Sequence, residues 1–146
     1  MPHQIIEYSA NLEAAMDIQA LVDAVHEVAT QIDIFPLGGL RTRAARRDHY
    51  RIADGHPDNS FVHLTWKLGS GRPEGVRKEA GDFMFARLCG ILESEYSQSP
   101  MAISFEIQEI HPVLTYKKNN IREHMANREK KSIESQTAIE STSNKS

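Results

Sequence analysis

The chain has 146 residues, of which 40% are hydrophobic and 25% are charged, and its formal net charge is −3. This length suits one domain with its own hydrophobic core. The slightly negative charge argues against a dedicated nucleic-acid binder, and no apolar run approaches the roughly 18 residues that a membrane span requires. Because the first residues lack the basic and apolar regions of a secretory signal, we expect a cytoplasmic protein.

The first part of the chain has the pattern of a strand, a helix and a second strand. Residues 2–8 are expected to form the first strand. Apolar residues recur at helical spacing over 18–32, and Asp17 precedes them as the expected N-cap. A proline followed by Gly38 and Gly39 then turns the chain, and the second strand is expected over residues 40–46.

The same pattern follows a second time. Residues 61–68 are rich in strand formers, and the Gly-Ser-Gly segment 69–71 ends this strand. Pro73 suits the first turn of a helix, whose apolar stripe continues to Leu92. Glycines at positions 75, 81 and 90 each disfavour this helix by up to about 1 kcal/mol relative to alanine. Residues 102–110 are expected to form the fourth strand.

Two strand–helix–strand units in succession predict an α+β fold of the βαβ-repeat type. Right-handed crossovers leave the strands of each unit parallel, which gives one four-stranded mixed sheet with two helices on one face. The opposite face carries Phe61 and Lys67 of the third strand and has no helix to cover it. Because exposed apolar area is unfavourable, we expect further copies of the chain to cover this face.

The composition becomes polar beyond Asn120, with two adjacent lysines followed by many serines and threonines. We therefore divide the chain into a folded domain, residues 1–120, and a polar C-terminal tail, residues 121–146, that we expect to be mobile. A short helix near residues 122–131 is the regular element expected there.

Pro2 is the candidate catalytic residue. Removal of Met1 would leave a secondary amine at the mature amino terminus, and such an amine accepts a proton, whereas a peptide nitrogen does not. A simple α-amino group has a pKa of about 7.7–8.0, which nearby cations or an apolar surrounding would lower. A base whose pKa lies near the working pH is the most effective one.

Two arginines are candidate binding residues for carboxylates. Arg41 begins the second strand behind the glycine turn, and strand alternation puts it on the same side as Arg43. Arg72 lies where the Gly-Ser-Gly loop enters a helix, and the free backbone N–H groups there favour an anion. A guanidinium binds a carboxylate through two parallel hydrogen bonds. The remaining arginines of this region, at positions 46, 47 and 51, are expected to be solvated.

Other chemistries find no support in the sequence. The seven histidines show no metal-ligand spacing, so we expect no metal site. Cys89 is the single cysteine, which excludes a disulfide within the chain, and we expect it to be a small buried side chain. Glu106 and Glu109 do not share a strand face, which disfavours a site of paired carboxylates.

Several segments match, in order, one known family. They are MPHQIIEY at 1–8, IFPLGGLRTR at 34–43, ADG at 53–55, FVHLT at 61–65, GSGR at 69–72, SFEIQEIHP at 104–112 and KNN at 118–120. With them the chain resembles the 5-carboxymethyl-2-hydroxymuconate isomerases of the tautomerase superfamily, from Met1 to about Asn120. Gln4, Tyr8 and Trp66 depart from the family's pattern.

The resemblance implies a homotrimer and a cofactor-free enol-to-keto isomerisation of a small polycarboxylate in bacterial breakdown of homoprotocatechuate, which derives from 4-hydroxyphenylacetate. It implies that Pro2 is the proton-transferring base and that Arg41 and Arg72 bind carboxylates of the substrate. Two alternatives stay open. The first is a non-enzymatic trimeric ligand-binding or signalling protein of the same fold, which a retained Met1 would favour. The second is another tautomerase-type reaction, such as dehalogenation or hydration of an unsaturated acid.

Overall fold

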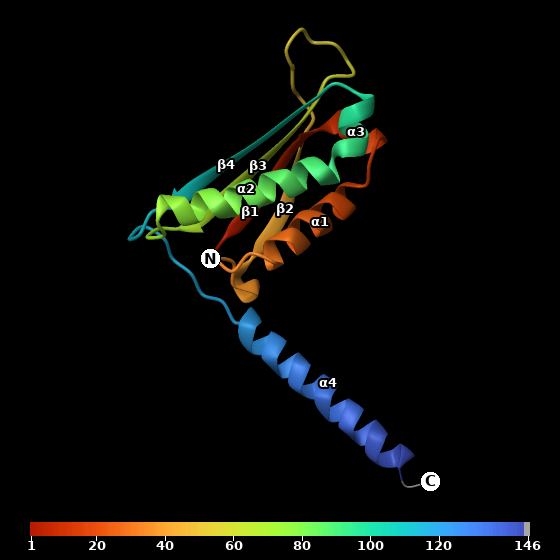
Figure 1. Cartoon of the computed structure of the whole chain (residues 1–146), viewed down its shortest axis with the longest axis vertical. Coiled ribbons are helices and arrows are strands. Elements are labelled where there is room, and N and C mark those ends of the chain that lie inside the picture. The colour runs from red at the N-terminus through yellow and green to blue at the C-terminus, as the bar shows by residue number, and fades with distance from the viewer. Residues whose placement is uncertain (145–146) are drawn as a thin grey trace. The chain divides into compact units, whose positions relative to one another are not determined.

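The computed structural model describes residues 1–144, which divide into two units. The first unit, Met1–Thr115, contains a β-sheet with its helices, and the second begins at Tyr116 and contains one helix (Figure 1). The expected boundary at residue 120 lies five residues beyond the observed one.

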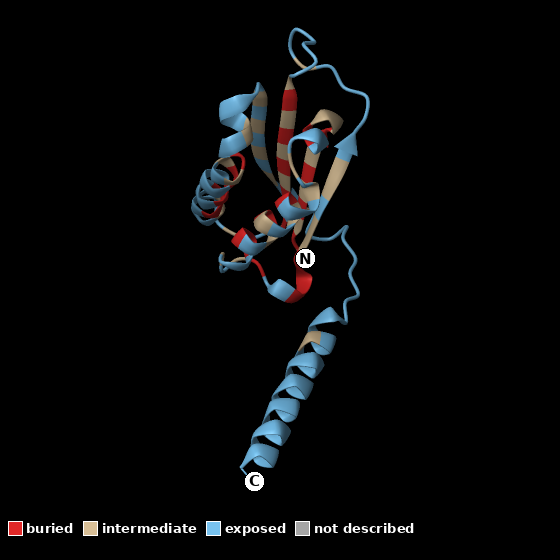
Figure 2. Ribbon diagram, turned by 90° about the vertical axis from the view of Figure 1, so that its right-hand side faces the viewer, coloured by how far each residue is buried: buried red, intermediate tan, exposed pale blue. Residues whose placement is uncertain are grey.

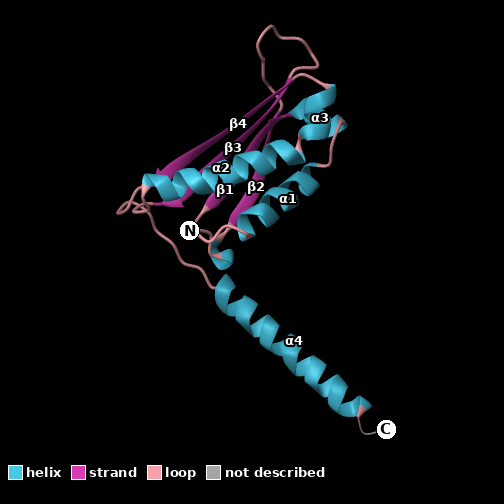
Figure 3. Cartoon of the chain, viewed as in Figure 1, coloured by secondary structure: helices cyan, strands magenta, loops and turns pink. Residues whose placement is uncertain are grey.

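The first unit contains the expected four-stranded mixed sheet (Figure 3). Its spatial order is β2-β1-β3-β4. Within each βαβ unit the strands are parallel, β1 with β2 and β3 with β4, whereas β1 and β3 are antiparallel. The strands are β1 (His3–Ser9), β2 (Arg41–Arg47), β3 (Ser60–Gly69) and β4 (Met101–Ile110), all within one or two residues of the sequence-based expectation.

Two helices, α1 (Ile18–Thr30) and α2 (Glu74–Ile91), lie on one face of the sheet (Figure 1). The carboxylate of Asp17 accepts a hydrogen bond from the backbone N–H of Ala20 at 3.2 Å, which confirms the expected N-cap of α1. A separate short helix, α3 (Glu93–Gln98), follows α2 almost directly. Two 3₁₀ turns complete the unit, η1 (Ala10–Ala14) and η2 (Leu37–Gly39).

The hydrophobic core lies between the sheet and these two helices. Alternate residues of the central strands point into it, and Figure 2 shows them as buried bands along the sheet. Trp66 is its largest fully buried side chain and makes edge-to-face contacts with the rings of Phe35 and Phe105, with centroids 4.7 and 4.8 Å apart. The alternation predicted for β3 is confirmed, because Val62, Leu64, Trp66 and Leu68 are at most 1% exposed.

The opposite face of the sheet, called here the open face, is not covered by these helices. It is formed by the other alternate residues of the strands, which are half-buried or exposed, whereas their neighbours in β1 and β3 are buried. On β1 these are His3, Ile5 and Glu7, and on β3 they are Phe61, His63, Thr65 and Lys67.

Cys89 of α2 is half-buried, so the expectation of a buried side chain is only partly correct.

In the second unit, α4 (Ile121–Ser143) is much longer than the short helix expected at 122–131. Residues with good helix propensity are frequent over this range, and it contains neither glycine nor proline. Its side chains are almost all exposed, and its expected mobility stays a prediction. No helix within residues 1–144 combines the length and the apolarity needed to cross a bilayer.

Candidate active site

Three strand ends meet at one edge of the sheet and bring the candidate residues there. The parallel pairing of β1 with β2 sets His3 beside Arg41, and the antiparallel pairing of β1 with β3 sets His3 beside Lys67. Consequently β1 and β2 begin where β3 ends. Pro2, Arg41 and the loop that holds Arg72 therefore lie at the same edge.

Pro2 is buried at the entrance to β1. Its carbonyl oxygen accepts a long hydrogen bond from the backbone N–H of Arg41, at 3.4 Å. The η2 turn passes close by, because a Cβ atom on Gly39 would lie 3.4 Å from Met1 Cγ and 3.7 Å from Pro2 Cδ. A side chain at position 39 would thus contact Met1 and the proline ring, and glycine avoids this contact. Met1 precedes Pro2 in the structure, so the nitrogen of Pro2 is an amide nitrogen here.

Arg41 turns its half-buried side chain toward the amino terminus. Its Nη2 donates to His3 Nε2 at 2.9 Å and lies 3.5 Å from the carbonyl oxygen of Met1. Its Nε is buried and has no hydrogen-bond partner within the described part of the chain. Arg43, two residues along the same strand, brings Nη1 to 3.1 Å from His3 Nδ1. His3 therefore lies between two guanidinium groups on the open face.

The sequence context did not identify His3 as a site residue, yet the pKa of its imidazole is strongly lowered. Burial is the largest cause, and together with the charges of Arg41, Arg43, Lys67 and the terminal amine it lowers the pKa of His3 from 6.5 to about 4. The imidazole is therefore neutral at pH 7. The signal that could have identified it is the pairing of β1 with β2, which joins residues 38 positions apart.

Arg72 lies in the same region but is held by backbone groups. Its Nη2 donates to the carbonyl oxygen of Ile34 at 3.0 Å, and its Nη1 lies 3.4 Å from that of Gly69. The loop bends sharply at Gly71, whose φ of +106° is a conformation that favours glycine. Within residues 1–144, no hydrogen bond or ion pair joins Arg72 to Pro2 or Arg41.

The other arginines of β2 are exposed, as expected. Arg46 pairs with Glu13 and Asp48, and Arg47 pairs with Glu7 at 2.6 Å. Their charges are compensated by carboxylates, and pairs of this exposed kind contribute little to stability. Of the β2 arginines, Arg41 and Arg43 therefore remain as the ones that lie near Pro2 without a carboxylate partner among the described residues.

Within residues 1–144, no group of three His, Cys, Asp or Glu side chains could hold a metal ion.

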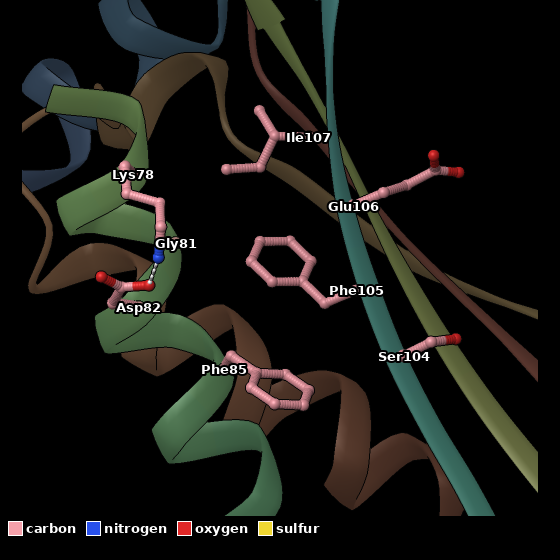
Figure 4. A pocket seen from close by; sticks show the side chains of 8 residues that line it. All are labelled: Lys78, Gly81, Asp82, Phe85, Ser104, Phe105, Glu106 and Ile107. Carbon is pink, nitrogen blue, oxygen red and sulfur yellow. Dashed lines mark hydrogen bonds and ion pairs between the residues drawn. The ribbon is translucent and has the colours of Figure 1, made fainter. Parts of the chain in front are cut away.

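A groove of about 540 Å³ lies elsewhere, between α2 and β4 (Figure 4). Phe105 and Ile107 point from β4 toward α2, where Phe85 lines the same groove, and Glu106 points away. Its lining includes neither Pro2 nor the two candidate arginines. Apart from an exposed pair between Lys78 and Asp82, the side chains that face it are apolar. The groove therefore offers a contact surface rather than groups for proton transfer.

Two βαβ units that share one mixed sheet, with both main helices on one face, define a tautomerase-like fold. A proline directly before β1 and an arginine that begins the parallel neighbour β2 form the candidate active site of this fold.

Comparisons with known proteins agree with this fold. The family model described as 5-carboxymethyl-2-hydroxymuconate isomerase matches residues 2–125. A 5-carboxymethyl-2-hydroxymuconate Delta-isomerase of Escherichia coli is 37% identical over 121 residues, which is 83% of this chain and 96% of that protein. The crystal structure of a 5-carboxymethyl-2-hydroxymuconate isomerase from Deinococcus radiodurans R1 is 40% identical, with a TM-score of 0.77 over 85% of this chain and 93% of that one. A crystal structure of a 5-carboxymethyl-2-hydroxymuconate delta-isomerase has the same TM-score at 27% identity and covers 86% of this chain and 93% of its own.

The chain therefore belongs to the 5-carboxymethyl-2-hydroxymuconate isomerase family, and it is an isomerase. The family model ends at residue 125, so most of α4 lies beyond the part that it matches.

Proposed function

We propose that this isomerase converts the enol form of 5-carboxymethyl-2-hydroxymuconate, or a closely related dienol, to its unsaturated keto form. The reaction needs no cofactor and would serve the bacterial degradation of homoprotocatechuate. The observation that carries the proposal is the family match over residues 2–125, in a chain whose Pro2 begins the sheet beside Arg41.

In this mechanism Pro2 is the base. Once Met1 is removed, the neutral secondary amine takes the proton of the substrate hydroxyl, and a dienolate forms. The resulting ammonium then returns a proton to a distant carbon of the conjugated chain, so that no proton is gained or lost overall. Nearby guanidinium groups penalise the ammonium form and thereby lower the pKa of the amine toward neutrality. The position of Arg41, hydrogen-bonded through its backbone to Pro2, supports this electrostatic role.

Arg41 and Arg72 are proposed to bind substrate carboxylates. The side chain of Arg41 supports this role, because its Nε is buried without a partner and could donate to a ligand. Negative charge grows along the conjugated system as the dienolate forms, and cations that are already in place stabilise it without reorganisation. For Arg72 the support is its position at the same edge, although its own contacts are backbone carbonyls.

We further propose that the enzyme acts as a homotrimer. Three copies is the number that the family resemblance implies. Support comes from two surfaces that the first unit leaves uncovered by its own helices, namely the open face and the edge of β4 with its apolar groove. Size-exclusion chromatography with light scattering tests this, because a trimer has three times the chain mass of 16.5 kDa.

The experiment that tests the catalytic role modifies the terminal amine. Mass spectrometry should first show a mature chain that begins at Pro2. Acylation of that amine should abolish turnover, whereas Pro2→Ala, which keeps a primary amine, should retain partial activity. A chain that keeps Met1 provides the control, because its sequence is otherwise unchanged and its Pro2 nitrogen stays an amide. Full activity after complete acylation would contradict the proposal.

A further inference from the structure

Positive side chains gather on the open face where the strands meet at the active-site edge. His3 of β1 pairs in register with Arg41 of β2 and with Lys67 of β3, and Arg43 contacts the His3 ring from the next position of that face. We call His3, Arg41, Arg43 and Lys67 the basic cluster. Within residues 1–144 no carboxylate forms an ion pair with its two arginines or its lysine, whereas the nearby Arg47 pairs with Glu7.

The donors and acceptors inside this cluster do not match, so not all of its close contacts can be hydrogen bonds. A guanidinium only donates, and a neutral imidazole offers one acceptor nitrogen and one N–H donor. His3 nevertheless has a guanidinium nitrogen at 2.9 Å from Nε2 and another at 3.1 Å from Nδ1. Only one of these two contacts can be a hydrogen bond, and the other sets one N–H group against another. If the shorter contact, to Arg41, is the hydrogen bond that Nε2 accepts, Nδ1 then carries the N–H opposite Arg43.

An acceptor that carries negative charge would remove this conflict. A carboxylate has only acceptor oxygens, and it can take hydrogen bonds from an imidazole N–H and a guanidinium together. Lys67 stands directly across from His3, at a spacing of about 5 Å between the Cβ atoms of opposed strand residues, and would add a further charge.

We propose that His3, Arg43 and Lys67 form a second carboxylate subsite beside Arg41 and that this subsite selects substrates bearing a third carboxylate. The identity of the substrate rests on the function proposed above. In this arrangement His3 positions Arg41 through Nε2 and donates to the carboxylate through Nδ1. The substrate then reaches from Pro2 to the adjoining end of the open face, where the cluster lies and where a neighbouring copy of the proposed trimer would border the site.

The first test compares two substrates. 5-Carboxymethyl-2-hydroxymuconate carries three carboxylates, and 2-hydroxymuconate lacks the carboxymethyl group and carries two. For Arg43→Gln and for Lys67→Gln, kcat/KM should fall at least tenfold more with the three-carboxylate substrate than with the other, mostly through KM. The matched control is Arg47→Gln, on the same strand and face but paired with Glu7. Equal losses on both substrates would overturn the subsite and leave the proposed reaction intact.

The second test does not depend on turnover. In the full mature protein, propane-1,2,3-tricarboxylate should bind and shift the NMR signals of the His3 ring. Glutarate, which has two carboxylates, should bind with a dissociation constant at least tenfold higher in the same titration. Arg43→Gln should weaken the binding of the tricarboxylate by a similar factor. Binding without any turnover of either dienol would refute the proposed function and keep the subsite. Turnover without a response of His3 to the tricarboxylate would refute the subsite alone.

Discussion

Trp66 donates its indole N–H to the side-chain oxygen of Gln4 at 2.9 Å, and both side chains are fully buried. Gln4 in turn donates to the hydroxyl of Thr42 at 2.8 Å, which also contacts His26 Nδ1 at 2.8 Å. This series of hydrogen-bonded side chains runs from β3 through β1 and β2 to α1. Gln4 and Trp66 thus satisfy each other, which explains how a polar Gln4 is accommodated in an apolar core.

Breaking this pair from either side should destabilise the protein. Trp66→Phe leaves the Gln4 oxygen without a donor, and Gln4→Met leaves the indole N–H without an acceptor, so each should lower the free energy of unfolding by about 1–3 kcal/mol. The double variant should lose clearly less than the sum, as expected for residues in direct contact. Urea denaturation measures all three. Gln98→Met, at an exposed site, is the control for the side-chain change and should stay within about 0.5 kcal/mol.

The fold could be predicted because its signals are local. Alternation along residues 61–68 and helical spacing from Ile18 onward each report a buried face, and the structure confirms both elements. Two βαβ units then leave few arrangements of four strands. The short α3 was not predicted, because the apolar stripe of the preceding helix continues to Leu92 without a break in sequence.

The site could be predicted only in part. Pro2, Arg41 and Arg72 follow from residue type and position in the chain, and their functional roles stay predictions. The contacts of His3 do not follow, because they depend on which strands are neighbours and in which register. For the same reason the sequence does not predict the hydrogen bond between Gln4 and Trp66, which lie 62 residues apart in the chain.

Gly71 should tolerate alanine poorly, for a backbone reason alone. A Cβ atom there would meet nothing within 4 Å, but its φ of +106° is strained for any residue with a side chain. We expect Gly71→Ala to lower the free energy of unfolding by about 1–2 kcal/mol and to reduce kcat/KM through the displacement of Arg72. Gly75→Ala is the matched control, since its Cβ is equally unobstructed, but it lies in α2 and should be stabilising by up to about 1 kcal/mol. Equal effects of the two substitutions would show that the loop does not need this conformation.

Gly81 sets the distance between α2 and β4. A Cβ atom there would lie 2.9 Å from Ile107 Cδ1, so the end of that side chain must move. Gly81→Ala should therefore gain less stability than the roughly 1 kcal/mol that alanine offers within a helix, or lose some. Gly90→Ala, where nothing lies within 4 Å, is the comparison and should be the more stable variant in urea. If Gly81→Ala proved as stable as Gly90→Ala, the contact across the groove would be looser than the structure has it.

Acidification should act on the protein through His3. Its pKa in the folded chain is lowered to about 4 from an ordinary 6.5, so between these values the unfolded chain binds the proton and the folded chain does not. The contribution of the neutral ring to stability is therefore complete above pH 6.5 and is lost as the pH falls through 4. Proton NMR of the His3 ring should give a midpoint near 4, and Arg43→Gln should raise it because one of the two contacting cations is removed.

The same shift predicts how stability depends on pH. Between pH 6.5 and 4, the free energy of unfolding of the wild type should decrease more steeply than that of His3→Asn, which has no group to titrate at this position. Urea denaturation at several pH values measures the difference between the two slopes. Added salt should raise the His3 midpoint only in part, because burial is the larger cause and screening acts on the charges alone. A His3 midpoint near 6.5 in the folded wild type would refute the position of this ring between Arg41 and Arg43.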